Sequence, residues 1–127
     1  MQENNLFEYA VIRVVPRVER EEFMNVGVIV YCAKQKFLQA LFTIDEIRLS
    51  AFARDLNLQE VAANLDAFQR ICAGDVHCGA IAKLDQASRF RWLTAMRSTV
   101  IQTSRVHPGL CKEASEKLEL LYREMVL

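Results

Sequence analysis

The sequence is poor in the residues that mark linkers, repeats and fibrous structure. It has only four glycines and two prolines in 127 residues, and it contains no low-complexity segment. This composition excludes collagen-like and disordered classes and is typical of a globular protein. At this length we expect one domain that covers residues 1–127.

Long hydrophobic runs are missing as well. No apolar stretch of the sequence approaches the ~20 residues that a membrane-spanning helix needs. The first ten residues, MQENNLFEYA, have neither the basic start nor the apolar core of a signal peptide. We therefore predict a cytoplasmic protein with no membrane partner.

The common metal-binding and catalytic motifs are also absent. None of the cysteines forms a C-x-x-C pair, and the closest two, Cys72 and Cys78, are six residues apart with His77 between them. That spacing argues against zinc and favours reduced, mostly buried thiols. The chain has no P-loop, dinucleotide-binding, nucleophile-elbow or zinc-protease motif. We expect neither a metal nor a cofactor.

Charge is balanced overall but unevenly distributed. Sixteen basic and 16 acidic residues give a formal net charge of zero, so the overall field does not favour nucleic acid. No acidic residue occurs from Gln86 to Cys111, and this acid-free window holds Arg89, Arg91, Arg97 and Arg105. Four arginines are few for a phosphate-binding surface, and acidic residues elsewhere would repel phosphates. We do not expect a nucleic-acid partner.

Strand patterns dominate the first third of the chain. Residues 9–15, 26–32 and 37–43 are rich in β-branched and aromatic residues, and the last two segments should form an antiparallel hairpin. Gly27 interrupts the second segment and indicates a bulge or the close approach of another backbone or a ligand. Residues 100–103 fit either a fourth strand or an extended loop, and His107-Pro108-Gly109 is typical of a turn.

Helical patterns follow. Thr43 begins a capping-box motif, after which Ile47, Ala51, Phe52 and Leu56 should face inward. Asn57 should cap a helix to about Cys72, Asp85 a helix over 86–95, and residues 112–127 should form the last helix. With strands early and helices late, we predict an α+β fold: a small antiparallel sheet of three to four strands with helices packed on it.

The acid-free window is the first candidate for a functional surface. Two guanidiniums, Arg97 and Arg105, flank hydroxyl and amide side chains, which suits a phosphate or carboxylate group. The alternative is a polar loop whose hydroxyls only satisfy nearby backbone groups. The residue types leave both interpretations open.

Two long segments carry a family resemblance. YAVIRVVPRVEREEFMNVGVIVYC (residues 9–32) and FRWLTAMRSTVIQTSRVHPGLC (residues 90–111) resemble the signature blocks of a bacterial family of domains of unknown function, number 3037. The family has no settled activity. Its members are often encoded beside a HipA-like kinase, so the resemblance implies an accessory or regulatory partner of such a kinase.

The two blocks also supply the candidate binding residues. They are Arg13, Arg17, Asn25, Gly27, Trp92, Arg97, Ser98, Gln102, Thr103, Ser104 and His107. If these residues form one site, Asn25–Gly27 and residues 97–104 should lie side by side.

Three functional hypotheses follow from these residues, and the weakest of them is a nucleic-acid binder. We favour a non-enzymatic binding protein whose Arg97-centred face contacts an anionic group or a protein partner. The alternative is a small enzyme for a phosphorylated or nucleotide substrate, with Arg97 and Arg105 as clamps and His107 as acid or base. No catalytic residue is assigned on the favoured hypothesis.

Overall fold

The computed structural model describes residues 5–127 and has an α+β fold, as the sequence predicted. Five strands form one sheet with purely antiparallel pairing, in the order β3-β2-β1-β4, and β5 also pairs with β1. The strands are β1 (Asn5–Val14), β2 (Met24–Cys32), β3 (Phe37–Phe42), β4 (Ile101–Thr103) and β5 (His107–Cys111).

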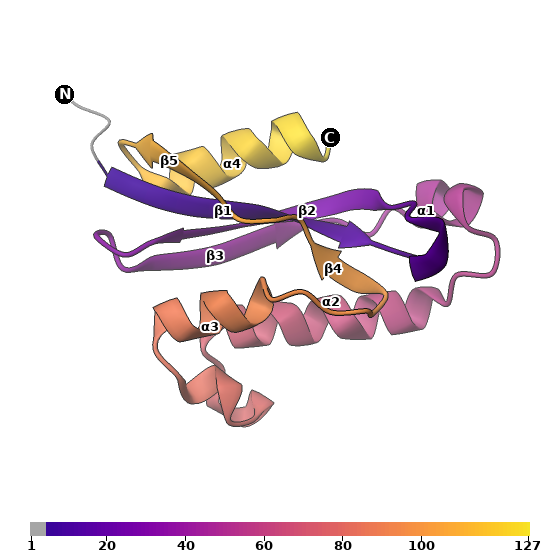
Figure 1. The fold of residues 1–127 in the computed structure, drawn as a ribbon, viewed down its shortest axis with the longest axis horizontal. Coiled ribbons are helices and arrows are strands. Elements are labelled where there is room, and N and C mark those ends of the chain that lie inside the picture. The colour runs from indigo at the N-terminus through magenta and orange to yellow at the C-terminus, as the bar shows by residue number, and fades with distance from the viewer. Residues whose placement is uncertain (1–4) are drawn as a thin grey trace.

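Helices cover both faces of the sheet (Figure 1). On one face α4 (Ala114–Met125) lies against β2 and β3, and on the other face lie α2 (Leu58–Ala73) and α3 (Gln86–Leu93). The short helix α1 (Glu46–Phe52) and the 3₁₀ turn η1 (Val18–Arg20) lie at one end of the molecule, and two further 3₁₀ turns, η2 (Val76–Cys78) and η3 (Ile81–Lys83), precede α3. Within residues 5–127, no helix is both long and apolar enough to cross a membrane.

The core has two parts because β1 and β2 alternate between the two faces. Ala10, Ile12 and Val14 join the cluster beneath α2 and α3, whereas Phe7, Val28 and Val30 join the cluster beneath α4. Residues that are buried on both faces of a strand are expected for the centre of a sheet covered on both sides. This places β1 at the structural centre of the molecule.

One edge of β1 is shared by two short strands. Its second half pairs with β4, Ile12 facing Thr103 and Val14 facing Ile101, and its first half pairs with β5, Tyr9 facing His107. The turn expected at His107-Pro108-Gly109 is therefore wrong, since these residues are in a strand. A proline is tolerated in β5 because the strand lies at the sheet edge.

Gly27 lies where β2 meets both of its neighbours. The register of β1 and β2 shifts beside it, so that Ile12 faces Gly27 while Arg13 faces Asn25. On the other side, a Cβ at Gly27 would come within 2.5 Å of the Leu41 carbonyl oxygen and 2.6 Å of the Phe42 Cβ. Both expectations for this glycine, a bulge and a close backbone approach, are confirmed, and the approaching backbone is that of β3.

Two of the three capping residues that the sequence predicts are confirmed. The Asn57 side chain accepts a hydrogen bond from the Glu60 N–H, and that of Asp85 accepts one from the Ser88 N–H. At α1 the predicted cap Thr43 is wrong, because Asp45 accepts from the Arg48 N–H instead. The inner face of α1 is wrong as well: Leu49 is 0% exposed, whereas Ile47 is 83% exposed.

Candidate functional site

The most developed side-chain arrangement on the surface pairs Arg97 with Trp92. The Arg97 guanidinium lies over the Trp92 ring, 4.2 Å from its centre, and also donates to the Trp92 carbonyl oxygen. A cation–π contact of this kind contributes about 0.5–1 kcal/mol at an exposed site. Trp92 remains 39% exposed, so the stacked pair is accessible from solvent.

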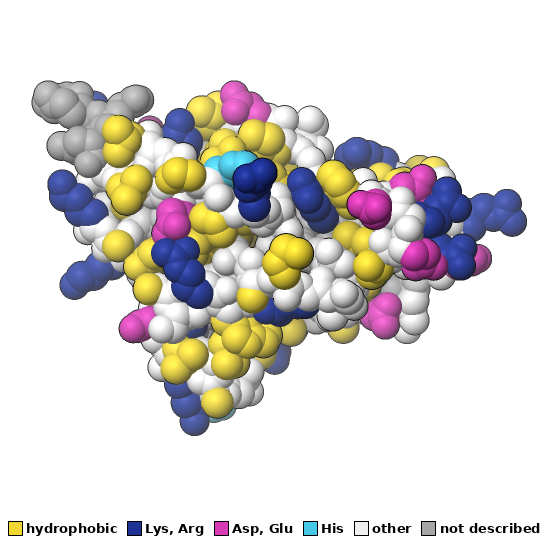
Figure 2. Space-filling view, in the orientation of Figure 1, with side chains coloured by type: hydrophobic (Ala, Val, Ile, Leu, Met, Phe, Trp, Pro, Cys, Tyr) yellow, Lys and Arg dark blue, Asp and Glu magenta, His cyan; other side chains and the backbone are white. Residues whose placement is uncertain are grey.

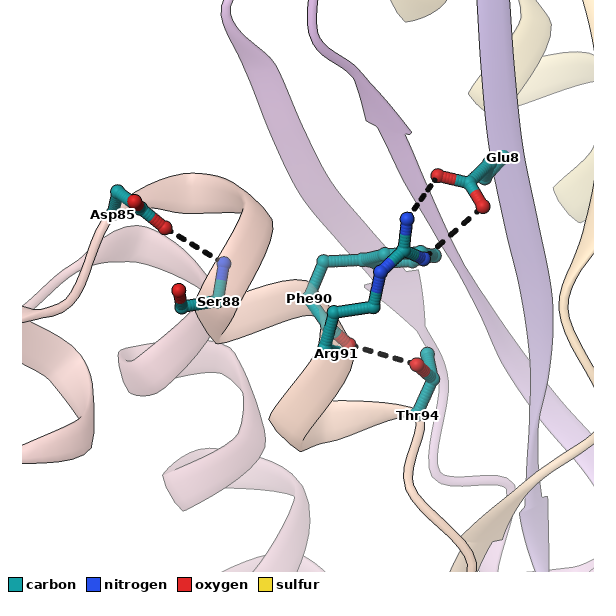
Figure 3. Close-up of polar contacts among 6 residues, drawn as sticks. All are labelled: Glu8, Asp85, Ser88, Phe90, Arg91 and Thr94. Atoms are coloured by element: carbon teal, nitrogen blue, oxygen red, sulfur yellow. Dashed lines mark hydrogen bonds and ion pairs between the residues drawn. The ribbon is translucent and has the colours of Figure 1, made fainter.

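The helix α3, which contains Trp92, is held by polar contacts at its ends and to β1 (Figure 3). Arg91 donates two hydrogen bonds to the Glu8 carboxylate, at 2.9 and 3.1 Å, which ties α3 to β1. These hydrogen bonds raise the pKa of Arg91. At the two ends of α3, Asp85 caps the helix and the Thr94 hydroxyl donates to the Phe90 carbonyl at 2.8 Å.

Beside the stacked pair is a small cavity, which we call the Trp92–Arg97 pocket. Its volume is about 120 Å³. Its walls come from α2, α3 and the segment that leads into β4, and they are Asn64, Ala67, Phe68, Ile71, Trp92, Leu93, Ala95, Arg97, Thr99, Ile101, Gln102 and Thr103. No acidic residue lines it, and its only charged group is Arg97.

A second, larger cavity of about 630 Å³ lies at the end of the sheet near α1 and η1. Arg17 and Ser98 line it, together with acidic side chains such as Glu22 and Glu60. Arg17 is within 3.5 Å of Glu19, and Arg20 pairs with Glu22 at 2.9 Å. Figure 2 shows charges of both signs crowded at this end, so the larger cavity has no clear preference for an anion.

Arg13 and Asn25 lie on the other face of the sheet, away from Arg97. The Asn25 amide donates to the Met125 carbonyl at the end of α4, and the Arg13 guanidinium lies 3.9 Å from the centre of the Phe23 ring. Burial lowers the pKa of Arg13. The Asn25 Oδ1 and Arg13 Nε atoms are buried without a hydrogen-bond partner among residues 5–127. The Asn25 contact joins β2 to the end of α4, and the Arg13 contact joins β1 to the residue that precedes β2.

The expectation that Asn25–Gly27 and residues 97–104 lie side by side is met only in part. Arg13 of β1 faces Asn25 on one side and Gln102 on the other, so the two segments lie in one part of the sheet but are separated by β1, at two inter-strand spacings or about 9–10 Å. His107 packs on Tyr9, with ring centres 5.3 Å apart, on the face of the sheet that α4 covers. The structure therefore does not bring His107 together with Arg97.

Ser104 has a structural position between β4 and β5. Its hydroxyl accepts from the Val11 N–H at 2.9 Å and donates to the Arg105 carbonyl, while its own N–H donates to the Val11 carbonyl at 2.8 Å. It thus satisfies the backbone of β1 at the point where one edge strand ends and the next begins. For this residue the structure agrees with the alternative of a hydroxyl that serves nearby backbone groups.

Replacing Ser104 by alanine should lower the free energy of unfolding by about 1–3 kcal/mol. The change removes the only side-chain acceptor of the Val11 N–H, and a buried donor without a partner is costly. Urea unfolding followed by circular dichroism measures this difference. Ser98→Ala is the matched control, because Ser98 is exposed, and it should shift stability by less than about 0.5 kcal/mol. Equal stabilities of the two variants would contradict the role given to Ser104.

The remaining predicted residues line the Trp92–Arg97 pocket. The Gln102 amide donates to the Thr99 carbonyl at 2.9 Å, and the Thr103 hydroxyl points to the Thr94 carbonyl at 3.4 Å. Sequence reasoning missed the wall that α2 supplies, because Phe68 and Ile71 recur at the spacing typical of the buried face of a helix. It also missed Met96, which is 99% exposed in the same loop. An apolar residue in a polar, acid-free loop was the available signal.

The cysteines lie mostly in the core, as expected. Cys32, Cys72 and Cys111 are buried and Cys78 is partly exposed, with all four free. Burial raises the pKa of Cys72 to about 12, which keeps its thiol protonated and unreactive. Within residues 5–127, no group of three or more His, Cys, Asp or Glu side chains is placed to hold a metal ion.

Comparison with known families gives one clear result. A family model described as "Protein of unknown function (DUF3037)" matches residues 9–126. The chain belongs to this family. The match includes both signature blocks and all of the helices, so the pocket lies wholly within the family's domain. Comparisons with curated proteins and with solved structures give no match.

Proposed function

We propose that this protein is a non-enzymatic accessory protein that binds a protein partner through the Trp92–Arg97 pocket and the loop beside it. The observation that carries the proposal is a stacked, solvent-accessible Arg–Trp pair next to a small cavity with a mixed apolar and polar lining. Tryptophan and arginine, with tyrosine, are enriched among the residues that dominate binding energy at protein interfaces. Figure 2 shows hydrophobic side chains exposed over α3 and over the loop between α3 and β4.

The partner to test first is a HipA-like kinase. The family resemblance implies such a kinase as the partner, which is the reason for choosing it. The pocket adds a physical reason for a protein partner in general. Its lining combines apolar side chains with amide and hydroxyl groups, as in the centre and rim of a protein interface.

Arg97→Ala should weaken the complex with the partner by roughly 30-fold in dissociation constant, which corresponds to about 2 kcal/mol. Affinity capture from the native host, followed by titration calorimetry with the purified partner, measures the change. Arg123→Ala is the matched control, because Arg123 is exposed on α4, on the opposite face of the sheet. Recovery of no partner, or equal affinities for the two variants, would refute the proposal.

A phosphate or nucleotide ligand is tested in parallel. A ligand at a hundredfold excess over its dissociation constant stabilises the folded state by about 2.7 kcal/mol. If phosphate or a nucleotide raises the melting temperature of the wild-type protein but not of Arg97→Ala, the pocket binds that ligand rather than a protein segment.

A further inference from the structure

We infer that the Trp92–Arg97 pocket takes one apolar side chain of an acidic partner segment, with Arg97 pairing to a carboxylate next to that side chain. This inference rests on the proposed function and specifies the chemistry of the partner. It concerns the short sequence that docks, which the proposal of a protein partner leaves open.

The size of the pocket limits what can enter it. Its volume of about 120 Å³ is close to the ~150 Å³ of an apolar protein cavity that holds benzene. It is well below the ~300–1,000 Å³ that is usual for drug-sized ligands and cofactors. One aliphatic or small aromatic side chain therefore fits, and the apolar walls of Phe68, Ile71 and Leu93 favour it over a polar group.

The charge at the pocket determines which type of residue should flank that side chain in the partner segment. In the acid-free window, Arg91 is paired with Glu8, and Arg89 donates to the carbonyls of Leu84 and Cys72. By contrast, Arg97 and Arg105 pair with no carboxylate among residues 5–127. Of these two arginines Arg97 lines the pocket, so a positive charge without a carboxylate partner lies in the pocket wall.

The stacking on Trp92 fixes the orientation of the Arg97 guanidinium. The ring and the Trp92 carbonyl together hold the guanidinium in one position, so little side-chain freedom is lost when a carboxylate binds. An arginine fork also matches the two oxygens of a carboxylate. A free phosphate would engage Arg97 but make no apolar contact with the pocket walls, so an acidic peptide complements the site more fully.

The larger cavity does not offer the same match. Its arginines are balanced by acidic side chains in the same lining, including Glu22, Asp55 and Glu60. An acidic segment would meet repulsion there as well as attraction. The charge distribution therefore favours the Trp92–Arg97 pocket as the place where an acidic segment docks.

The test uses the intrinsic fluorescence of Trp92, the only tryptophan in the chain. The full-length protein is titrated with an eight-residue Gly/Ser peptide that carries one leucine between two aspartates. We expect a change in Trp92 emission with a dissociation constant on the order of 1 mM or tighter. Replacing the peptide's leucine by alanine, or its aspartates by lysines, should weaken binding at least tenfold.

Two protein variants separate the pocket from its surroundings. Ala67→Leu adds a larger side chain at the pocket wall and should abolish peptide binding, whereas Ala63→Leu, outside the pocket on the same helix, should leave it unchanged. Arg97→Ala should weaken binding of the aspartate peptide to the level of the lysine peptide. Circular dichroism melts of all three variants establish that each is folded.

Several outcomes would overturn this inference. They are no binding at about 10 mM peptide, equal binding of the alanine or lysine peptides, and equal behaviour of Ala67→Leu and Ala63→Leu. A partner complex that depends on Arg97 but tolerates Ala67→Leu would also overturn it, while leaving the proposed function intact. If the peptide binds as expected but the native host yields no partner, the pocket chemistry stands and the proposed function fails.

Discussion

The Phe90→Ala variant should have a free energy of unfolding about 3–5 kcal/mol below that of the wild-type protein. Phe90 is 0% exposed and its ring lies 5.3 Å from that of Tyr31, within the core cluster beneath α2 and α3. Truncation to alanine loses that burial and leaves a cavity. Typical domains are stable by about 5–15 kcal/mol, so the variant should lie near the limit of folding. Urea titration followed by circular dichroism at 222 nm measures the loss.

Ile47→Ala is the matched control for this prediction. Ile47 is a large apolar residue on a helix, but most of its side chain is exposed, so its removal should cost less than about 0.5 kcal/mol. Similar losses in the two variants would contradict the packing of α3 on the sheet. Phe90 packs the helix α3, which also contains Trp92, onto the sheet. The Phe90→Ala variant should therefore lose partner binding together with stability, whereas Arg97→Ala should lose partner binding alone.

Gly27→Ala should destabilise the protein by about 1–3 kcal/mol, and Gly27→Val by more. The added Cβ collides with the backbone of Leu41 and with the Cβ of Phe42, neither of which can rotate away. The β2–β3 pair must separate locally to admit it, which strains the hydrogen bonds on both sides of the bulge. Differential scanning calorimetry of the two variants and of wild type measures the effect.

The control for Gly27 is Gln39→Ala, at an exposed position on the same hairpin. It should leave the melting temperature within about 1–2 °C of wild type. If Gly27→Ala melted with the wild type but lost partner binding, the glycine would serve a ligand rather than the sheet. That result would support its inclusion among the candidate binding residues.

The parts of the fold that the sequence predicts are those with a strong local signal. The inward face of α2, from Leu58 to Cys72, repeats at helical spacing over four turns, and Asn57 and Asp85 cap the helices that they precede. The β2–β3 hairpin is equally local. By contrast, α1 has only seven residues, and in so short a helix the apolar pattern is compatible with more than one inner face. Tertiary packing determines that Leu49 is the residue of α1 that faces the core.

The strand β5 was missed for a different reason. Its Pro108 and Gly109 are turn-forming residues, and only pairing with the distant β1 makes their extended conformation stable. The same long-range pairing divides the candidate site. Neighbouring residues of a strand point to opposite faces, and β1 separates β2 from β4. Residues of the two signature blocks therefore do not all lie on one surface. What the sequence did indicate was Trp92 with Arg97, because both lie in one short segment.

The shared edge of β1 also sets the order in which the chain can assemble. The hairpin of β2 and β3 is complete at residue 42, and it can pair with β1 as soon as it has been synthesised. The other edge of β1 must wait for residues 101–111, and its contact through Ser104 joins residues 93 positions apart. At roughly 5–20 residues per second, synthesis of the 69 residues from position 42 to position 111 takes roughly 3–14 s. During that time an unpaired strand edge is a template for other chains, so aggregation competes with folding until β5 arrives.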